Sequence, residues 1–163
     1  MTGALGITPI GYVRGGRVEA IDDDWGDVEC TIELDADQFG PDVLAGLDAF
    51  SHVEIVYIFH LVADEEIETG ARHPREREDW PLVGIFSQRG KGRPNRVGTT
   101  TCEIVSIDGL SLRVRGLDAI DGTPVIDIKP FMTAFAPRSA VREPVWAKEL
   151  MADYWHATEH VDW

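Results

Sequence analysis

Short β-favouring segments recur along most of the chain, and this recurrence constrains the fold more than any other feature. They are recognised by alternation of apolar and polar residues, or by runs of β-branched and aromatic residues. They span residues 7–18, 28–34, 52–60, 83–87, 98–107, 111–117 and 123–128. Asp108-Gly109, between two of these runs, is a hairpin signal. The pattern predicts a mainly β chain that folds as a small β-barrel with few helices.

Helical spacing is confined to two regions. Residues 37–47 carry a proline suited to a first turn and an apolar stripe, which predicts a short helix. Residues 143–159 place Trp146, Leu150 and Tyr154 at i, i+4 and i+8, which predicts an amphipathic helix. Its aromatic residues are interpreted as packing residues.

The length of 163 residues favours one domain with an adequate core. We expect a β-barrel domain over residues 1–142 and a helical tail over 143–163, packed on the barrel or on a partner subunit. No apolar run approaches the roughly 20 residues that a membrane span requires. The first residues lack the basic and apolar regions of a secretion signal, so a cytoplasmic protein is expected.

The two cysteines, Cys30 and Cys102, lie far apart in the sequence. They are too few, and wrongly spaced, to indicate a metal site, so no metal is expected. We expect them to be reduced thiols, buried or on an edge strand.

The net charge of -14 is unfavourable for a protein that binds nucleic acid, because phosphate binding depends on lysine and arginine. Residues 72–96 differ from the rest, with seven cations against three anions. This segment could form one positive face. A solvated loop whose arginines and glutamates pair with each other is the alternative.

Charged residues interrupt the apolar run of residues 121–130, Asp-Gly-Thr-Pro-Val-Ile-Asp-Ile-Lys-Pro. A strand that only filled a core would not need Asp127 and Lys129 at alternate positions. A period of two places Val125, Asp127 and Lys129 on one face, and Ile126, Ile128 and Pro130 on the other. We expect the second face to belong to the core and the charged face to serve a function.

Two further segments carry polar residues beside apolar strands. Residues 84–98 lead into a turn with three bends (Gly90, Gly92 and Pro94), four cations and Asn95. Residues 50–60 form a β-favouring run with a histidine near each end. Ser51-His52 in this run is interpreted as a buried hydrogen-bonded pair.

These three segments together resemble the TrmO family, also called TsaA-like or YaeB-like proteins. The resemblance covers residues 7–135. It rests on Phe50-Ser51-His52 with His60, Arg93-Pro94-Asn95 with Gly98, and Asp121-Gly-Thr-Pro-Val followed by Asp127-Ile-Lys-Pro130. The resemblance implies an S-adenosylmethionine-dependent tRNA methyltransferase built on a β-barrel. The chain also lacks a G-x-G-x-x-G motif after a strand, as expected for a fold other than the Rossmann sheet.

The resemblance also implies a cofactor site near a homodimer interface. Carried over by position, the cofactor-binding residues are His60, Leu61, Arg89, Thr99, Asp118, Ala119, Ile120 and Asp121, with Trp25 and Gly26 placed by location alone. Asp118 or Asp121 could accept hydrogen bonds from the ribose hydroxyls or from the ammonium group of the methionine moiety. Arg89 could pair with the carboxylate of that moiety, because guanidinium binds carboxylate in a bidentate manner.

The acceptor implied by the resemblance is N6 of threonylcarbamoyladenosine beside the tRNA anticodon. Asn95, Asp127 and Lys129 are the candidate catalytic residues, and the sequence does not choose a general base among them. Candidate contacts to phosphate or to the threonyl carboxylate are Arg72, Arg75, Arg77, Lys91, Arg93 and Arg96. Two alternatives stay open: a methyltransferase of the same fold with a small-molecule acceptor, and a non-catalytic module that binds S-adenosylmethionine.

Overall fold

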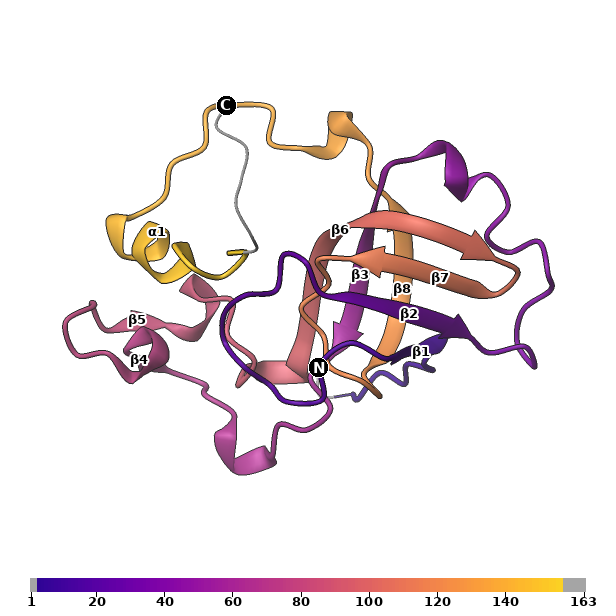
Figure 1. Ribbon diagram of the computed structural model, residues 1–163. Helices are drawn as coiled ribbons and strands as arrows, with labels where there is room; N and C mark the ends of the chain where they lie inside the picture. The colour runs from indigo at the N-terminus through magenta and orange to yellow at the C-terminus, as the bar shows by residue number, and fades with distance from the viewer. Residues whose placement is uncertain (1–2, 157–163) are drawn as a thin grey trace.

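A closed barrel of six antiparallel strands forms the centre of the computed structural model, which describes residues 3–156 (Figure 1). The strand order around the barrel is β1-β2-β7-β6-β3-β8, and β8 closes it by pairing with β1. The strands are β1 (Gly11–Arg14), β2 (Glu29–Leu34), β3 (His52–Ile58), β6 (Val97–Asp108), β7 (Ser111–Arg115) and β8 (Pro124–Pro130). The predicted mainly β barrel is therefore confirmed.

Alternation along the strands directs one apolar face of each into the barrel. Ile32 on β2, Ile55 on β3 and Leu112 on β7 are fully buried. Burial of each such side chain contributes about 1.5–3 kcal/mol to folding. Strand β1 is shorter than predicted, because Gly15 and Gly16 follow it with positive φ angles of 78° and 75°.

A bulge in β8 changes the predicted alternation of its side chains. Val56 of β3 pairs with Asp127, but the next residue, Tyr57, pairs with Val125, so Ile126 is an extra residue. As a result Val125 points into the core, and the prediction that it shares a face with Asp127 is wrong. Beyond the bulge Ile128 packs against the core. Asp127 and Lys129 share a face as predicted, and on it they form an ion pair with each other.

The connections gather at two ends of the barrel. We call the end that carries residues 15–28, 59–96 and 116–123 the loop end, and the end that carries residues 35–51 and 109–110 the opposite end. At the opposite end, Asp108 pairs with Ser111 across a two-residue turn, which confirms the predicted hairpin.

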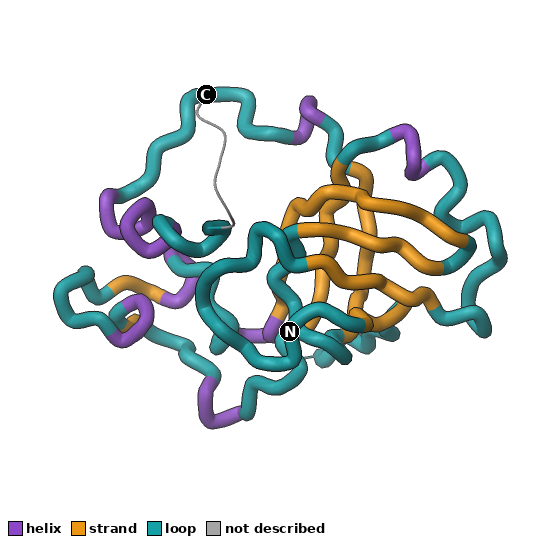
Figure 2. Tube along the Cα trace, in the orientation of Figure 1, coloured by secondary structure: helices purple, strands orange, loops and turns teal. Residues whose placement is uncertain are grey.

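The long connection between β3 and β6 has its own small sheet beside the barrel (Figure 2). The segment at 83–87, predicted as a barrel strand, provides only β5 (Val83–Gly84), which pairs with β4 (Ala71–Arg72). The rest of it forms a 3-10 turn. The 3-10 turns of this connection are η2 (Asp64–Glu66), η3 (Pro74–Glu76), η4 (Ile85–Ser87) and η5 (Pro94–Arg96).

The helix predicted over residues 37–47 does not form. The backbone there makes i to i−3 hydrogen bonds, from Val43 to Gly40 and from Ala45 to Asp42, and leads into η1 (Leu47–Ala49). Gly46 has a φ of 87°, which a right-handed helix does not allow. The apolar residues that suggested the helix still reach the core, and Leu44 is buried.

The chain leaves β8 at the opposite end and returns along residues 131–144, which include η6 (Thr133–Phe135), to the loop end. There it forms α1 (Val145–Met151), close to β4 and β5 (Figure 1). The predicted terminal helix is thus confirmed but short, and residues 157–159 of that prediction lie outside the described residues. The division into 1–142 and 143–163 stays a prediction.

Ser51 and His52 are hydrogen-bonded as predicted, with Ser51 Oγ 2.7 Å from His52 Nδ1, but both are exposed rather than buried.

Cys30 and Cys102 are free and buried, and burial raises the pKa of each thiol to about 12. Over residues 3–156 no helix is long and apolar enough to cross a membrane. The same part of the chain shows no group of three or more potential metal ligands.

Gly98 allows the Tyr57 ring to lie against β6, which gives a test of the packing. A Cβ at position 98 would lie 2.7 Å from two Tyr57 ring atoms and 2.8 Å from Phe59 Cζ. We expect Gly98→Ala to lower the free energy of unfolding by about 1–3 kcal/mol, because an overpacked core must shift its side chains. Urea unfolding measures this loss.

The matched control is Gly84→Ala, where the nearest atom would be 3.9 Å from the new Cβ. Equal stability of the two variants would contradict the packing described for Tyr57.

Candidate functional site

Three hydroxyl groups converge on the carboxylate of Asp118 at the loop end. Tyr57 Oη donates to Asp118 Oδ1 over 3.0 Å, and Thr100 Oγ1 donates to the same oxygen. Tyr154 Oη, from the segment after α1, donates to Oδ2. One carboxylate therefore joins β3, β6, the 116–123 connection and the C-terminal segment.

The barrel itself supplies two of these donors. Tyr57 and Thr100 occupy inward-facing positions on adjacent strands, and both are buried. Their hydroxyls lie 3.3 Å apart. Polar groups in an apolar interior require partners, and Asp118 is the shared acceptor that satisfies both. The barrel core consequently holds the Oδ1 oxygen of this carboxylate.

The environment keeps both phenols protonated. Burial raises the pKa of Tyr57 far above its usual range, and the charge of Asp118 raises it further. Burial and then Asp118 raise the pKa of Tyr154 in the same direction. Both side chains are therefore neutral hydrogen-bond donors to Asp118 across the neutral range.

A cation lies close to this carboxylate cluster. The positive charge of Arg89 acts to lower the pKa of Tyr57, and Arg89 Nη2 donates to the Thr99 carbonyl over 2.8 Å. Arg89 is exposed, so its guanidinium can also meet a ligand. A fixed carboxylate and a nearby guanidinium suit a ligand that carries both an ammonium or hydroxyl donor and a carboxylate acceptor.

The 116–123 connection brings further predicted residues to the same end of the barrel. Asp121 Oδ1 accepts from the Gly15 backbone N–H over 2.9 Å, and Asp121 N–H donates to the Arg17 carbonyl over 2.7 Å. His60 lies beside the turn, with Nε2 3.8 Å from where a Cβ of Gly122 would be. Asp121 therefore ties two loop-end connections together.

The other predicted cofactor contacts differ in exposure. Leu61 is 69% exposed, whereas Ala119 is buried in the core cluster. The Ile120 carbonyl accepts from both the backbone and the hydroxyl of Thr123. Of these, Leu61 offers the most open side chain.

Trp25 is a packed residue of the 15–28 connection. Trp25 is buried, and its indole N–H donates to the Ile21 carbonyl over 2.8 Å. The guanidinium carbon of Arg17 lies 4.5 Å from the centroid of the Trp25 ring. The Trp25 backbone N–H donates to the Tyr154 carbonyl over 2.9 Å. Neighbouring Gly26 lies next to the turn at Gly116. Trp25 thus lies beside the segment that carries Tyr154, and Gly26 lies beside the 116–123 connection.

Most of the predicted substrate-binding cations already have protein partners. Arg75 pairs with Asp23 at 2.8 Å, Arg77 with Asp79 and Arg96 with Asp64, and Arg93 donates to the Gln88 carbonyl over 2.6 Å. Arg72 is partly buried, with Gly90 and Gly92 close to its guanidinium, and Lys91 is exposed. The paired-loop alternative is therefore correct in part, although the partners are aspartates rather than the neighbouring glutamates.

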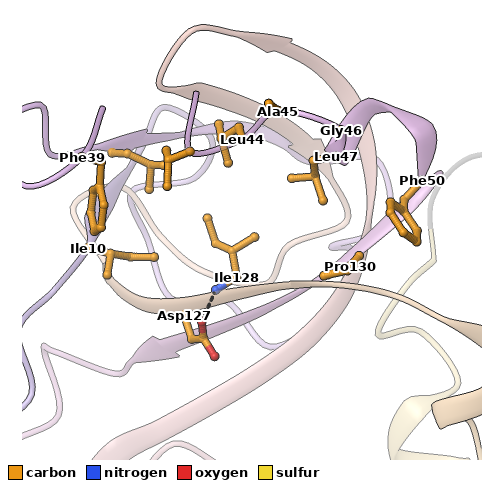
Figure 3. Close-up of a pocket in the computed structure, with 12 residues that line it drawn as sticks. Ile10, Phe39, Leu44, Ala45, Gly46, Leu47, Phe50, Asp127, Ile128 and Pro130 are labelled. Carbon is orange, nitrogen blue, oxygen red and sulfur yellow. Dashed lines mark hydrogen bonds between the residues drawn. The ribbon is translucent and has the colours of Figure 1, made fainter. Parts of the chain in front are cut away.

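Asn95 lies in η5 at the loop end, where its φ of 64° is one that asparagine tolerates well. Asp127 and Lys129 face outward from β8, and Asp127 Oδ1 accepts from the Ile128 N–H over 2.9 Å (Figure 3). The described hydrogen bonds and ion pairs of Asp127 and Lys129 do not join them to Asn95.

Asp127 also lines a pocket of about 580 Å³ toward the opposite end of the barrel. Figure 3 shows apolar side chains of the β2–β3 connection, including Phe39 and Leu47, facing Ile128 across it. This pocket is separate from the Asp118 cluster and lacks its convergent hydroxyls, so we place the candidate site at the loop end.

Sequence reasoning missed the roles of Tyr57, Thr100 and Tyr154. The first two carried a usable signal, because each is a polar residue at an inward position of a strand. Tyr154 carried none, since its helical spacing suggested only packing and its partner is 36 residues away.

The family model for the tRNA-methyltransferase O N-terminal domain matches residues 23–136. The chain belongs to this family. The match contains Asp118, Tyr57 and Thr100, and leaves Tyr154 outside.

Several relatives and solved structures share this family fold. The chain is 35% identical over 102 residues to human tRNA (adenine(37)-N6)-methyltransferase, covering 63% of this chain and 23% of the relative. It is 43% identical over 90 residues to a "Probable S-adenosyl-L-methionine-binding protein" of Methanothermobacter thermautotrophicus, covering 55% and 61%. The crystal structure of TrmO from Pseudomonas aeruginosa superposes with a TM-score of 0.70 at 25% identity, covering 88% and 63%. The chain thus spans less than two thirds of the length of each.

The two buried phenols predict a specific behaviour at alkaline pH. Because their pKa values are raised, their neutral forms favour the fold, and this contribution is lost as the pH rises above about 10, where unfolded tyrosine ionises. Of the three tyrosines, we expect Tyr57 and Tyr154 to ionise only on unfolding. Near-ultraviolet absorbance and urea unfolding, followed across this pH range, measure the two effects.

A double variant, Tyr57→Phe with Tyr154→Phe, should remove most of this alkaline loss of stability. Ionisation of all three tyrosines in the folded protein would refute the burial of the cluster.

Proposed function

We propose that this protein is an S-adenosylmethionine-dependent methyltransferase that methylates N6 of threonylcarbamoyladenosine at position 37 of tRNA. The observation that carries the proposal is the Asp118 carboxylate, held by three hydroxyls with Arg89 nearby. Membership of the family, and the methyltransferase activity for which several relatives are named, support the same reaction.

The residues at the loop end fit the cofactor. A carboxylate offers about four acceptor positions, and three at Asp118 have protein donors, which leaves capacity for a ribose hydroxyl or an ammonium group. Arg89 would meet the carboxylate of the methionine moiety. His60, Leu61 and Thr99, around the same loops, would contact the rest of the ligand, with Asp121 holding the turn.

When bound, S-adenosylmethionine supplies the transferable methyl and its sulfur leaving group. The protein's share is to hold acceptor and donor in line and to exclude water. Attack by N6 forms the N–C bond as the C–S bond breaks, and N6 then gives up a proton. Asn95 is proposed to orient the acceptor base. Asp127 and Lys129 stay candidates for the proton transfer, and both would act from the outer face of β8.

We further propose a homodimer in the cytoplasm with the anticodon region of tRNA as partner. Lys91 is exposed, and Arg75 and Arg96 could exchange their aspartate partners for phosphate. The acidic net charge and these existing ion pairs favour a small-molecule acceptor as the second candidate.

The decisive experiment combines binding and turnover. Calorimetry with S-adenosylmethionine should show binding, and labelled methyl should transfer to total tRNA from a strain that lacks the gene. Nucleoside mass spectrometry should then locate the methyl on threonylcarbamoyladenosine. Binding without labelled tRNA would shift the assignment to a metabolite acceptor or a binding module. Absence of binding would refute the proposal.

Asp118→Asn tests the carboxylate within the same assay. The change keeps the shape of the side chain but removes its charge, and hydrogen bonds to charged groups contribute about 1.5–3 kcal/mol. We expect at least a roughly tenfold rise in the Kd for S-adenosylmethionine. Asp108→Asn is the matched control, because Asp108 is exposed in the hairpin at the opposite end.

A further inference from the structure

The C-terminal segment reaches the candidate site through one side chain. Tyr154 Oη donates to Asp118 Oδ2, the oxygen that the barrel hydroxyls do not contact. We propose that Tyr154 is a positioning residue that fixes the Asp118 carboxylate for the ligand, so that residues 145–156 form part of the site. This inference rests on the proposed binding of S-adenosylmethionine at the loop end.

The need for a second anchor follows from the geometry of the carboxylate. Tyr57 and Thr100 both donate to Oδ1, so Oδ2 has no donor from the barrel. A donor on Oδ2 holds the second oxygen as well and further restricts rotation of the carboxylate about its Cβ–Cγ bond. Asp118 lies in a connection without regular secondary structure, where no sheet pairing sets its orientation. Tyr154 supplies the missing constraint.

The segment that carries Tyr154 is held on both sides. The Tyr154 backbone carbonyl accepts from the Trp25 N–H over 2.9 Å, and the Asp153 carbonyl accepts from the Asp24 N–H over 3.1 Å. On the other side, the Trp80 indole N–H donates to Glu149 Oε2 over 2.7 Å, and Trp80 is buried. The segment is thus attached to the two long connections that flank Asp118.

The chemistry of the phenol suits a positioning role. Burial raises the pKa of Tyr154, so it is a neutral donor that orients the carboxylate without cancelling its charge. A lysine or arginine at this place would neutralise the carboxylate and compete with a cationic ligand. Oδ2 therefore keeps acceptor capacity for a ligand.

Tyr154→Phe tests the role in the full chain, because it removes only the hydroxyl. We expect the Kd and the KM for S-adenosylmethionine to rise about tenfold, while kcat stays within about twofold. In an Asp118→Asn background the same change should have little further effect, because the two residues act as a pair. Tyr12→Phe is the matched control, since Tyr12 is on β1, 39% exposed, beside Arg14.

The outcomes separate the two proposals. If the wild type binds S-adenosylmethionine and Tyr154→Phe binds it equally well or more tightly, the positioning role is overturned and the proposed function stands. If Tyr154→Phe still raised the Kd for S-adenosylmethionine about tenfold in the Asp118→Asn background, the positioning role would also be overturned, because Tyr154 would then act independently of Asp118. A wild-type protein that binds no S-adenosylmethionine overturns both.

A second variant covers the case in which Tyr154→Phe does not fold. Glu149→Gln weakens the bond to the Trp80 indole but leaves the phenol in place. We expect it to raise the Kd for S-adenosylmethionine by a few-fold, with an unchanged thermal midpoint for the barrel. An unchanged Kd would count against the segment as part of the site.

Discussion

Closure of the barrel depends on β8, which must pair with β1 on one side and β3 on the other. Two local features accompany this double pairing. At Gly11 a Cβ would lie 2.3 Å from the Glu33 carbonyl oxygen, so β1 approaches β2 more closely than a side chain allows. In β8 the bulge at Ile126 shifts the alternation, so that Val125 and Ile128 both serve the core. The closed ring then sets which connections share the loop end.

A buried hydrogen-bond cluster is the chemical consequence of that ring. Strand pairing places the hydroxyls of Tyr57 and Thr100 side by side at the end of an otherwise apolar interior. Asp118 accepts a hydrogen bond from each of them and so satisfies both. The contacts that complete the core therefore also hold Oδ1 of the carboxylate at the proposed site, which is how the fold and that site are linked.

The sequence predicted the barrel well because alternation in strands such as β2 and β7 reflects one buried face, and because β3 is a run of β-branched and aromatic residues. The prediction failed at residues 37–47, where the local pattern was ambiguous. The apolar residues there pack at one end of the barrel, but the backbone does not form a helix. For the site, the motif around Asp118 and Asp121 was predictable by resemblance, and the structure shows how it is held. Tyr154 could not be found, because its hydrogen bond depends on the path of residues 131–144 rather than on any local pattern.

The ion pairs of the 59–96 connection also affect how an RNA would associate. A phosphate that bound Arg75 or Arg96 would have to displace the carboxylate already paired with that arginine, Asp23 or Asp64. It would not be binding an unpaired cation. The affinity of a protein for nucleic acid falls with salt because counterions are released from the phosphates. Here the salt that weakens the RNA contact would also weaken the competing carboxylate pair. The affinity would therefore decline less steeply with salt than the number of arginines suggests.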